Sequence, residues 1–370
     1  MFSNPEGTQH RRLHVSQAGE FIAAVPGYVG FVPERSLVIA IYDRPRAGRA
    51  SASIEVVVQF DLDLGRPSVP AQLAAAITRL CPADGTDVDA LLVDDRLDES
   101  HYRGEPGGGT DAWCAFIDAV MDAPRRAGVR LANAWAVRAI AAGERWWSLV
   151  DGSHGELPDP GASIVAATRV ANGGTIHRTR DELAAIFARD ADSAAQVAAV
   201  LPDEVSADQD WRAAALERGD LDTYHRDALQ RVLRVITTLD ANTRPAARDI
   251  AAVAAVLRDR RVRDMMFAFA VTDHAGPAQH LWSAMTRALS GSDRAETAAL
   301  FAYNAYLQGG GPLAGMAVDA ALDSDDQHAI ADLLHRAFSH GIRPALLRRL
   351  ADNAINMAAH LDVDLGPIRA

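Results

Sequence analysis

The spacing of apolar residues changes near residue 180, and this change constrains the fold more than any other feature of the 370-residue chain. Before it, short β-branched runs at residues 37–42, 54–60 and 90–94 alternate with stretches of helical periodicity. After it, apolar residues recur at helical spacing alone. We therefore predict an α/β domain over residues 1–180, with a mixed sheet and flanking helices, followed by an all-α domain over residues 181–370.

The order of elements in the first domain follows from turn residues and periodicity. The first two β-branched runs are separated by turn residues and predict a hairpin. A helix is expected between Pro70 and Pro82, because proline opens helices well and does not continue them. Residues 110–127 predict a second helix, and residues 129–138 return to β character.

Glycine and proline mark further boundaries. A helix before the first strand is expected to end at Val25, ahead of a proline, and residues 151–161 predict an exposed loop. In the helical half, residues 307–312 and 338–344 each combine an apolar anchor, a glycine turn and a proline that opens the next helix. This faint repeat leaves two alternatives for the second domain, helical-repeat-like packing and an irregular bundle.

Charge and composition exclude several classes of protein. The net charge is −12, and all 37 basic residues are arginine, so a general nucleic-acid binder, which needs a basic excess, is not expected. The two cysteines, Cys81 and Cys114, have no metal-ligand spacing and fit a reducing cytoplasm. The longest apolar runs fall far short of the roughly 20 residues that span a bilayer. We therefore expect a cytoplasmic protein without membrane insertion.

The carboxyl end of the strand at residues 90–94 carries the first candidate site. Asp94 and Asp95 stand at an edge where open α/β sheets bind ligands, and paired carboxylates there can hold a divalent cation. The glycine-rich segment 104–111 leads through Thr110 into a helix whose first amides can receive an anion. Neither segment matches a known phosphate-binding fingerprint. A flexible loop is the alternative interpretation, and we predict no metal site and no cofactor.

A second candidate is the string Arg145-Trp146-Trp147-Ser148. Adjacent strand residues face opposite sides, so one tryptophan is expected in the core and the other over a surface or cleft. An exposed ring beside Arg145 and Arg138 can stack on a ligand, whereas structural packing is the competing interpretation. The arginines Arg258, Arg260, Arg261 and Arg263 are similarly open to two interpretations, a solvated helix end or a contact with an acidic partner.

Several of these segments together resemble a known family. They are Val25-Pro26, Gly30-Phe31, Pro33 and Ser36-Leu37-Val38, then Arg145-Trp146-Trp147-Ser148 and residues 178–183. The pattern is similar to the signatures of a large actinobacterial family, domain-of-unknown-function family 4192. The resemblance extends over residues 13–355 and implies the same two-part layout, but it implies no activity. Relatives often carry a cysteine cluster after the tryptophan pair, and residues 149–158 contain no cysteine here.

Two hypotheses of function follow. The first is a binding or regulatory protein whose helical half contacts a partner protein or a second copy of the chain, with no catalytic residue assigned. The alternative is a hydrolase or transferase that acts on a small anionic substrate at the carboxyl edge of the sheet. Convergence of Asp94, Asp95, Thr110 and Arg138 in one concave pocket would favour the enzyme.

Overall fold

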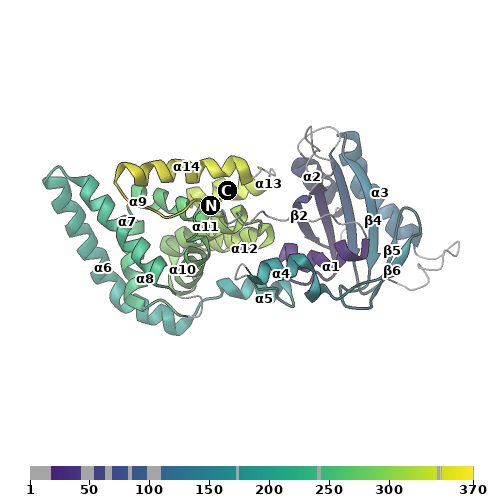
Figure 1. Cartoon of the computed structure of the whole chain (residues 1–370), viewed down its shortest axis with the longest axis horizontal. Coiled ribbons are helices and arrows are strands. Elements are labelled where there is room, and N and C mark those ends of the chain that lie inside the picture. The colour runs from purple at the N-terminus through teal and green to yellow at the C-terminus, as the bar shows by residue number, and fades with distance from the viewer. Residues whose placement is uncertain are drawn as a thin grey trace, which may run out of the picture. The chain divides into compact units, whose positions relative to one another are not determined.

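The computed structural model describes residues 18–42, 54–62, 69–81, 86–97, 110–171, 175–239, 243–339, 342 and 344–369. The chain forms two compact units. The first, the sheet unit, comprises Met1–Gly27 with Pro33–Ala167, and the second, the helical unit, comprises Tyr28–Val32 with Thr168–Ala370 (Figure 1). The predicted fold class, a mixed α/β sheet followed by helices, is confirmed. The predicted boundary at residue 180 stays a prediction.

The sheet unit contains one six-stranded mixed sheet in the order β2-β1-β3-β4-β5-β6. Its strands are β1 Ser36–Tyr42, β2 Ile54–Asp61, β3 Asp87–Val93, β4 Arg130–Val137, β5 Arg145–Ser148 and β6 His154–Glu156. The predicted hairpin is confirmed, since β1 and β2 pair antiparallel. Among the described strands of this sheet, β3 and β4 are the pair that runs parallel, and the chain between them includes α3 Thr110–Arg126. Their carboxyl ends therefore lie side by side at one edge of the sheet.

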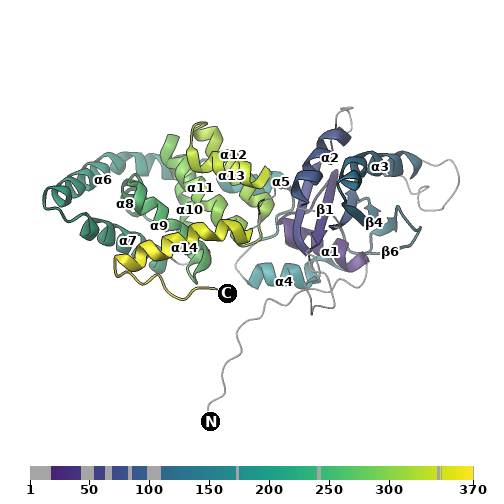
Figure 2. The ribbon, with the colours of Figure 1, turned by 90° about the horizontal axis from the view of Figure 1, so that it is seen from above.

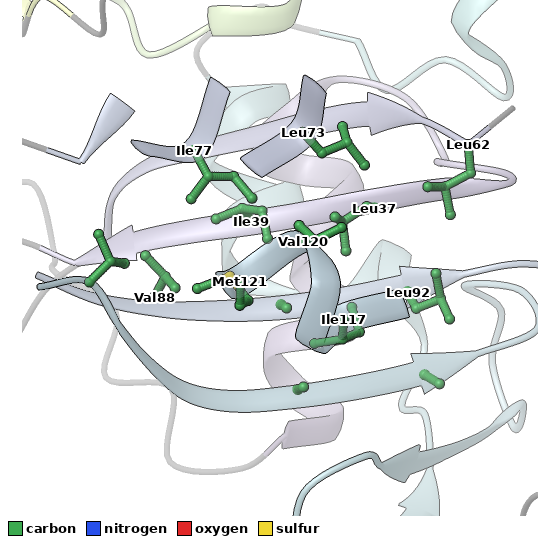
Figure 3. Close-up of a cluster of buried hydrophobic side chains, with 14 of the residues drawn as sticks. Leu37, Ile39, Leu62, Leu73, Ile77, Val88, Leu92, Ile117, Val120 and Met121 are labelled. Carbon is green, nitrogen blue, oxygen red and sulfur yellow. The ribbon is translucent and has the colours of Figure 1, made fainter. Parts of the chain in front are cut away.

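Helices cover the two faces of the sheet. On one face, α2 Val69–Leu80 and α3 pack side chains such as Ile77 and Val120 against Ile39 and Leu92 (Figure 3). On the other face, α1 Ala18–Val29 places Phe21 against Trp135 of β4, with ring centroids 5.4 Å apart. Alternate residues of each strand thus meet different helices. This explains why the central strands read as continuous apolar runs.

Two boundary predictions were wrong. The first helix continues through Pro26 to Val29, four residues beyond its expected end. Gly27 lies so close to α4 Ile164–Ala171 that a Cβ there would stand 2.8 Å from the backbone nitrogen of Ala166. Proline has no amide hydrogen to donate within the helix, and the close contact between α1 and α4 offsets this loss.

The second correction concerns residues 151–161, where the expected loop contains strand β6. Gly155 of β6 pairs with Trp146 of β5. A Cβ at this glycine would lie 3.0 Å from the indole Nε1, so the absence of a side chain lets the strand lie against the ring. Glycine is typical of turns, and this is why the sequence predicted a loop. At Gly155, however, glycine allows close packing against a ring.

The helical unit contains no strand longer than a single bridge among the described residues. Its principal helices are α5 Arg180–Ala184, α6 Ala191–Glu217, α7 Leu221–Thr238, α8 Ala247–Leu257, α9 Arg260–Met265, α10 Ala275–Ala288, α11 Gly291–Leu307, α12 Gly311–Ser324, α13 Ala329–Ser339 and α14 Pro344–His360 (Figures 1 and 2). Prolines open α12 and α14 as predicted. In the described segments, no helix is both long enough and apolar enough to cross a membrane.

Buried large side chains hold the helical unit together. Trp282 of α10 and Tyr303 of α11 are each about 1% exposed. The Tyr303 hydroxyl donates to the Leu347 carbonyl of α14 at 2.9 Å and accepts from the Ala351 amide at 3.1 Å. These two bonds satisfy a phenol that burial would otherwise leave without water.

Candidate functional site

The carboxyl edge of the sheet brings together three of the residues predicted from sequence. The Asp94 amide donates to the Val137 carbonyl at 3.1 Å, which fixes the end of β3 beside the end of β4. Arg138 follows directly, and its Nη2 donates to the Asp95 carbonyl oxygen at 3.2 Å. The parallel pairing of β3 with β4 thus produces the expected proximity of Asp94, Asp95 and Arg138.

The two aspartates do not act together, because each is held by a different arginine. Asp94 is fully buried and accepts from Arg96 at the amide (2.9 Å), at Nε (2.8 Å) and at Nη2 (2.6 Å). Asp95 is exposed and forms a two-pronged pair with Arg35 at 2.7 and 3.0 Å. The hydrogen bond from Arg35 lowers the pKa of Asp95.

The rest of this predicted pocket cannot be placed in full. The side chain of Thr110 and residues 104–109 lie outside the described residues. In the part of the chain that is described, no group of three or more His, Cys, Asp or Glu side chains is arranged to hold a metal ion. The described edge therefore consists of arginine–carboxylate pairs, and both of its aspartates have their oxygens directed at guanidinium groups.

The tryptophan pair divides between the two faces of the sheet. Trp147 is 6% exposed and packs in the core with α2 and α3. Trp146 is half-buried on the face of α1, where its Nε1 lies 3.2 Å from the position of a Cβ on Gly19. Arg145 is exposed. The alternation of the strand therefore separates Trp146 from Trp147, and the half-buried ring is lined by two glycines, Gly19 and Gly155.

A different concave site lies in the helical unit and includes part of the predicted basic run. We call it the helical groove: a cavity of about 640 Å³ lined by the end of α8, the start of α9, the first turns of α11 and the start of α13. Its apolar wall includes Leu257, Ile330 and Leu333. Leu333 is 46% exposed, so its side chain gives this wall an accessible apolar surface.

Ion pairs hold the walls of the helical groove in place. Arg258 donates to both oxygens of Asp293, at 3.0 and 2.7 Å, and so links the end of α8 to α11. Arg263 of α9 stands 3.6 Å from Glu296 of α11 and also pairs with its neighbour Asp264. The planar guanidinium suits such two-pronged contacts, which fix the relative position of two helices.

His328 connects α11 to the start of α13. Its Nδ1 lies 3.3 Å from the Ala331 amide nitrogen, and its Nε2 lies 3.3 Å from Glu296 Oε2. The second carboxylate oxygen, Oε1, is buried without a hydrogen-bond partner among the described residues. Glu296 thus completes the rigid wall with one oxygen and leaves the other unsatisfied.

Arg260 differs from Arg258 and Arg263 because, among the described residues, it forms none of the ion pairs that join the helices of the groove. It lies at the start of α9, is exposed, and has no ion-pair partner in the described part of the chain. The basic run in the sequence signalled this position, but the pairing of its neighbours with Asp293, Glu296 and Asp222 could not be deduced from spacing. Leu333 carried no signal, because a leucine at helical spacing predicts burial.

Comparisons with known proteins identify a family but no activity. A family model described as "Domain of unknown function (DUF4192)" matches residues 19–345, which include the sheet edge and the helical groove. No curated protein and no solved structure matches the chain.

Proposed function

Because the chain belongs to the DUF4192 family, whose description assigns no activity, we propose from its own geometry that it is a binding protein. Its helical groove would dock a segment of a partner protein that carries an acidic side chain next to an apolar one. One observation supports this above all: half-exposed Leu333 and exposed Arg260 line the same concave surface, whose other two arginines are paired with Asp293 and Glu296.

The chemistry of the helical groove favours this occupant. An apolar side chain placed on Leu257, Ile330 and Leu333 would gain the free energy of leaving water, about 25 cal/mol for each Å² buried. A carboxylate of the partner could bind the guanidinium of Arg260 without displacing another carboxylate of the described residues. A basic side chain placed against Arg260 would be repelled, whereas Arg258 and Arg263 are already paired with Asp293 and Glu296. The carboxylates that line the surface are already bound: Asp293 by Arg258, Glu296 by Arg263 and Asp325 by Ser292.

The alternative, a hydrolase or transferase at the sheet edge, has less support. Asp94 would have to release Arg96, which contacts both of its oxygens, before it could act as an acid, base or metal ligand. Asp95 would have to release Arg35 in the same way. We also infer from the lysine-free composition and the two free cysteines that the protein functions in a reducing actinobacterial cytoplasm.

Peptide binding tests the proposal with a defined probe. A fluorescent peptide that alternates aspartate and leucine would be titrated against the full-length protein, with an arginine–leucine peptide of equal length as the charge control. We expect the acidic peptide to bind at least about tenfold more tightly, and the preference to shrink as salt screens the charges. Equal binding of both peptides would contradict the proposed chemistry.

Matched variants locate the binding surface. Arg260→Glu and Leu333→Asp should each weaken the acidic peptide about tenfold or more. Arg234→Glu in α7 and Leu216→Asp in α6 change an exposed arginine and an exposed leucine elsewhere in the same unit, and should leave binding unchanged. If the control variants weakened binding as strongly as the two test variants, the helical groove would not be the binding site.

A further inference from the structure

The outer edge of the sheet at β2 is an incompletely paired surface. β2 lies at the end of the strand order, and β1 is the one strand that pairs with it in the described part of the chain (Figure 1). Six of the seven side chains of β1 are buried, whereas Ile54, Val56, Val57 and Phe60 of β2 are each half-buried. The apolar row of β2 is therefore only partly covered within one copy of the chain.

This strand carries few of the devices that normally protect a sheet edge: two acids, Glu55 and Asp61, and a register shift at one end. It runs Ile-Glu-Val-Val-Val-Gln-Phe-Asp over Ile54–Asp61, with no proline, no lysine and no arginine. Its pairing with β1 is regular from Asp61 to Val56, and the register shift comes only at the Tyr42 end. No described strand pairs with its outer side, and a long, regular, β-branched edge is a template for another strand.

The sequence of β2 is complementary to itself when two copies run antiparallel about Val57. In that register Val57 faces its own copy, Val56 faces Val58, and Ile54 faces Phe60. Asp61 then lies beyond the paired segment. A two-fold axis on Val58 would instead set Asp61 opposite Glu55, two acids that repel each other. Charge and apolar matching thus select one register.

Helix α2 offers support beside the same edge. Its Leu73 and Ile77 pack on the side of the sheet near Ile39 and Leu62 (Figure 3). Its outward residues include Ala71 and Ala75, both exposed and small. Small side chains would let α2 of a second copy approach closely once the two β2 strands pair.

We infer that the chain forms a symmetric dimer in which β2 pairs antiparallel with β2 of a second copy, giving a continuous twelve-stranded sheet. The contact is isologous, so it closes at two copies and leaves no further edge at β2. It rests on the sheet unit alone and does not depend on the helical groove. Pairing of one strand and one helix per copy is a small interface, so we expect dissociation on the order of micromolar.

Sedimentation and light scattering of the full-length protein, from about 1 to 200 μM, test the inference. The wild type should pass from monomer to dimer in this range. Val57→Lys places two like charges on the axis and should leave a monomer, while Val57→Thr keeps a β-branched side chain and should leave the dimer intact. A wild type that stays monomeric throughout, or a dimer that Val57→Lys does not weaken, would overturn the inference.

Cysteine substitutions decide the register even if the lysine variant folds poorly. With Val57 on the axis, two copies of Val57→Cys bring their Cα atoms to about 5 Å, within the range of a disulfide. Two copies of Asp61→Cys stand about 27 Å apart in the same register, because eight residues separate them along the strands. Mild oxidation should crosslink the first variant and not the second, with the wild type as the background. Equal crosslinking of both variants would contradict the proposed register.

Discussion

The sheet unit and the helical unit use their arginine–carboxylate pairs differently. In the sheet unit, Asp94 is buried and held by Arg96, but the other described pairs, such as Arg35–Asp95 and Arg130–Asp87, have both partners substantially exposed. In the helical unit the carboxylates of Asp259, Glu204 and Asp293 are mostly buried, while their arginines reach out to water. Exposed pairs contribute little to stability, whereas a buried carboxylate that loses its partners is strongly destabilising.

Asp259 shows what a buried carboxylate does in a bundle. It is 6% exposed, accepts from Arg212 of α6 at 2.8 Å and lies 3.3 Å from His225 Nε2 of α7. It also caps α9 by accepting from the amides of Arg261 and Val262. One side chain thus fixes three helices relative to one another.

Among the substitutions that test this difference between the units, removal of Asp259 should reduce stability the most. We expect Asp259→Ala to lower the free energy of unfolding by about 3–4 kcal/mol, because it removes the carboxylate that contacts Arg212 and His225 Nε2 and that caps α9. Asp87→Ala in the sheet unit removes an exposed partner of Arg130 and should change stability by less than about 1 kcal/mol. Urea unfolding of both variants measures the difference, and equal losses would contradict the comparison.

The pH dependence of two buried aspartates should have opposite signs. Burial acts to raise the pKa of Asp259, but hydrogen bonds from Arg212 and the Val262 amide outweigh it and hold the pKa below its usual value. Its contribution is therefore present above the unfolded pKa of about 4 and is lost as the pH falls through the folded value. Burial raises the pKa of Asp89 on β3, despite hydrogen bonds from Tyr42 and Asn133.

For Asp89 the contribution to stability is full below the unfolded pKa and is lost as the pH rises through the folded value. Stability relative to wild type should therefore move in opposite directions for Asp259→Asn and Asp89→Asn as the pH is raised from about 3 to 7. Urea unfolding at several pH values measures the overall stability, and hydrogen exchange of the backbone amides reports the stability of each unit. The same direction for both variants would show that one of the two pKa shifts has the wrong sign.

Alanine substitutions at two glycines should distinguish a closely packed helix contact from an open helix surface. Gly27→Ala places a Cβ 2.8 Å from the Ala166 nitrogen and 2.9 Å from Val165 Cγ1, and should cost about 1–3 kcal/mol of stability. Thermal unfolding followed by circular dichroism would register the change. A neutral Gly27→Ala would mean that α1 and α4 can separate without penalty.

Gly315→Ala in α12 should have the opposite and smaller effect. Nothing lies within 4 Å of a Cβ built at this position. Alanine should stabilise the helical unit by about 0.5–1 kcal/mol, because it restricts the unfolded chain and favours helix. The same thermal measurement checks it, and a destabilised variant would show that the surface around α12 is covered in solution.

The smallest effect is expected at the sheet edge. Asp95→Asn removes the charge that pairs with Arg35, but both side chains remain in water and the backbone contact of Arg138 with residue 95 is kept. The midpoint of thermal unfolding should not change measurably, and the salt dependence of stability should weaken only slightly. A large loss of stability at this position would show that exposed pairs matter as much in the sheet unit as buried ones do in the helical unit.

Local patterns predicted elements well, and close tertiary approaches account for the errors. The hairpin of β1 and β2 and the prolines that open α12 and α14 were confirmed, because each depends on residues next to one another in the chain. The end of α1 and strand β6 were missed. Both depend on a glycine, Gly27 or Gly155, that lies against another element, and spacing cannot distinguish such a glycine from a turn.

The candidate sites divide along the same line. Alternation along β5 is enough to send Trp146 and Trp147 to opposite faces, and parallel pairing is enough to bring Arg138 to Asp95. The partners of the aspartates follow from packing instead: Arg35 reaches Asp95 across 60 residues of sequence.

The sequence by itself determined the fold class of this protein, because strand and helix periodicities are set by backbone geometry that each short segment carries on its own. Only the tertiary structure decided which charges are paired and which apolar and basic side chains stay exposed. Arg258, Asp293 and Leu333 come from three helices, and their common surface exists only when the helices are packed. The same packing leaves Arg260 and Leu333 exposed, while Arg258 and Arg263 pair with carboxylates of α11.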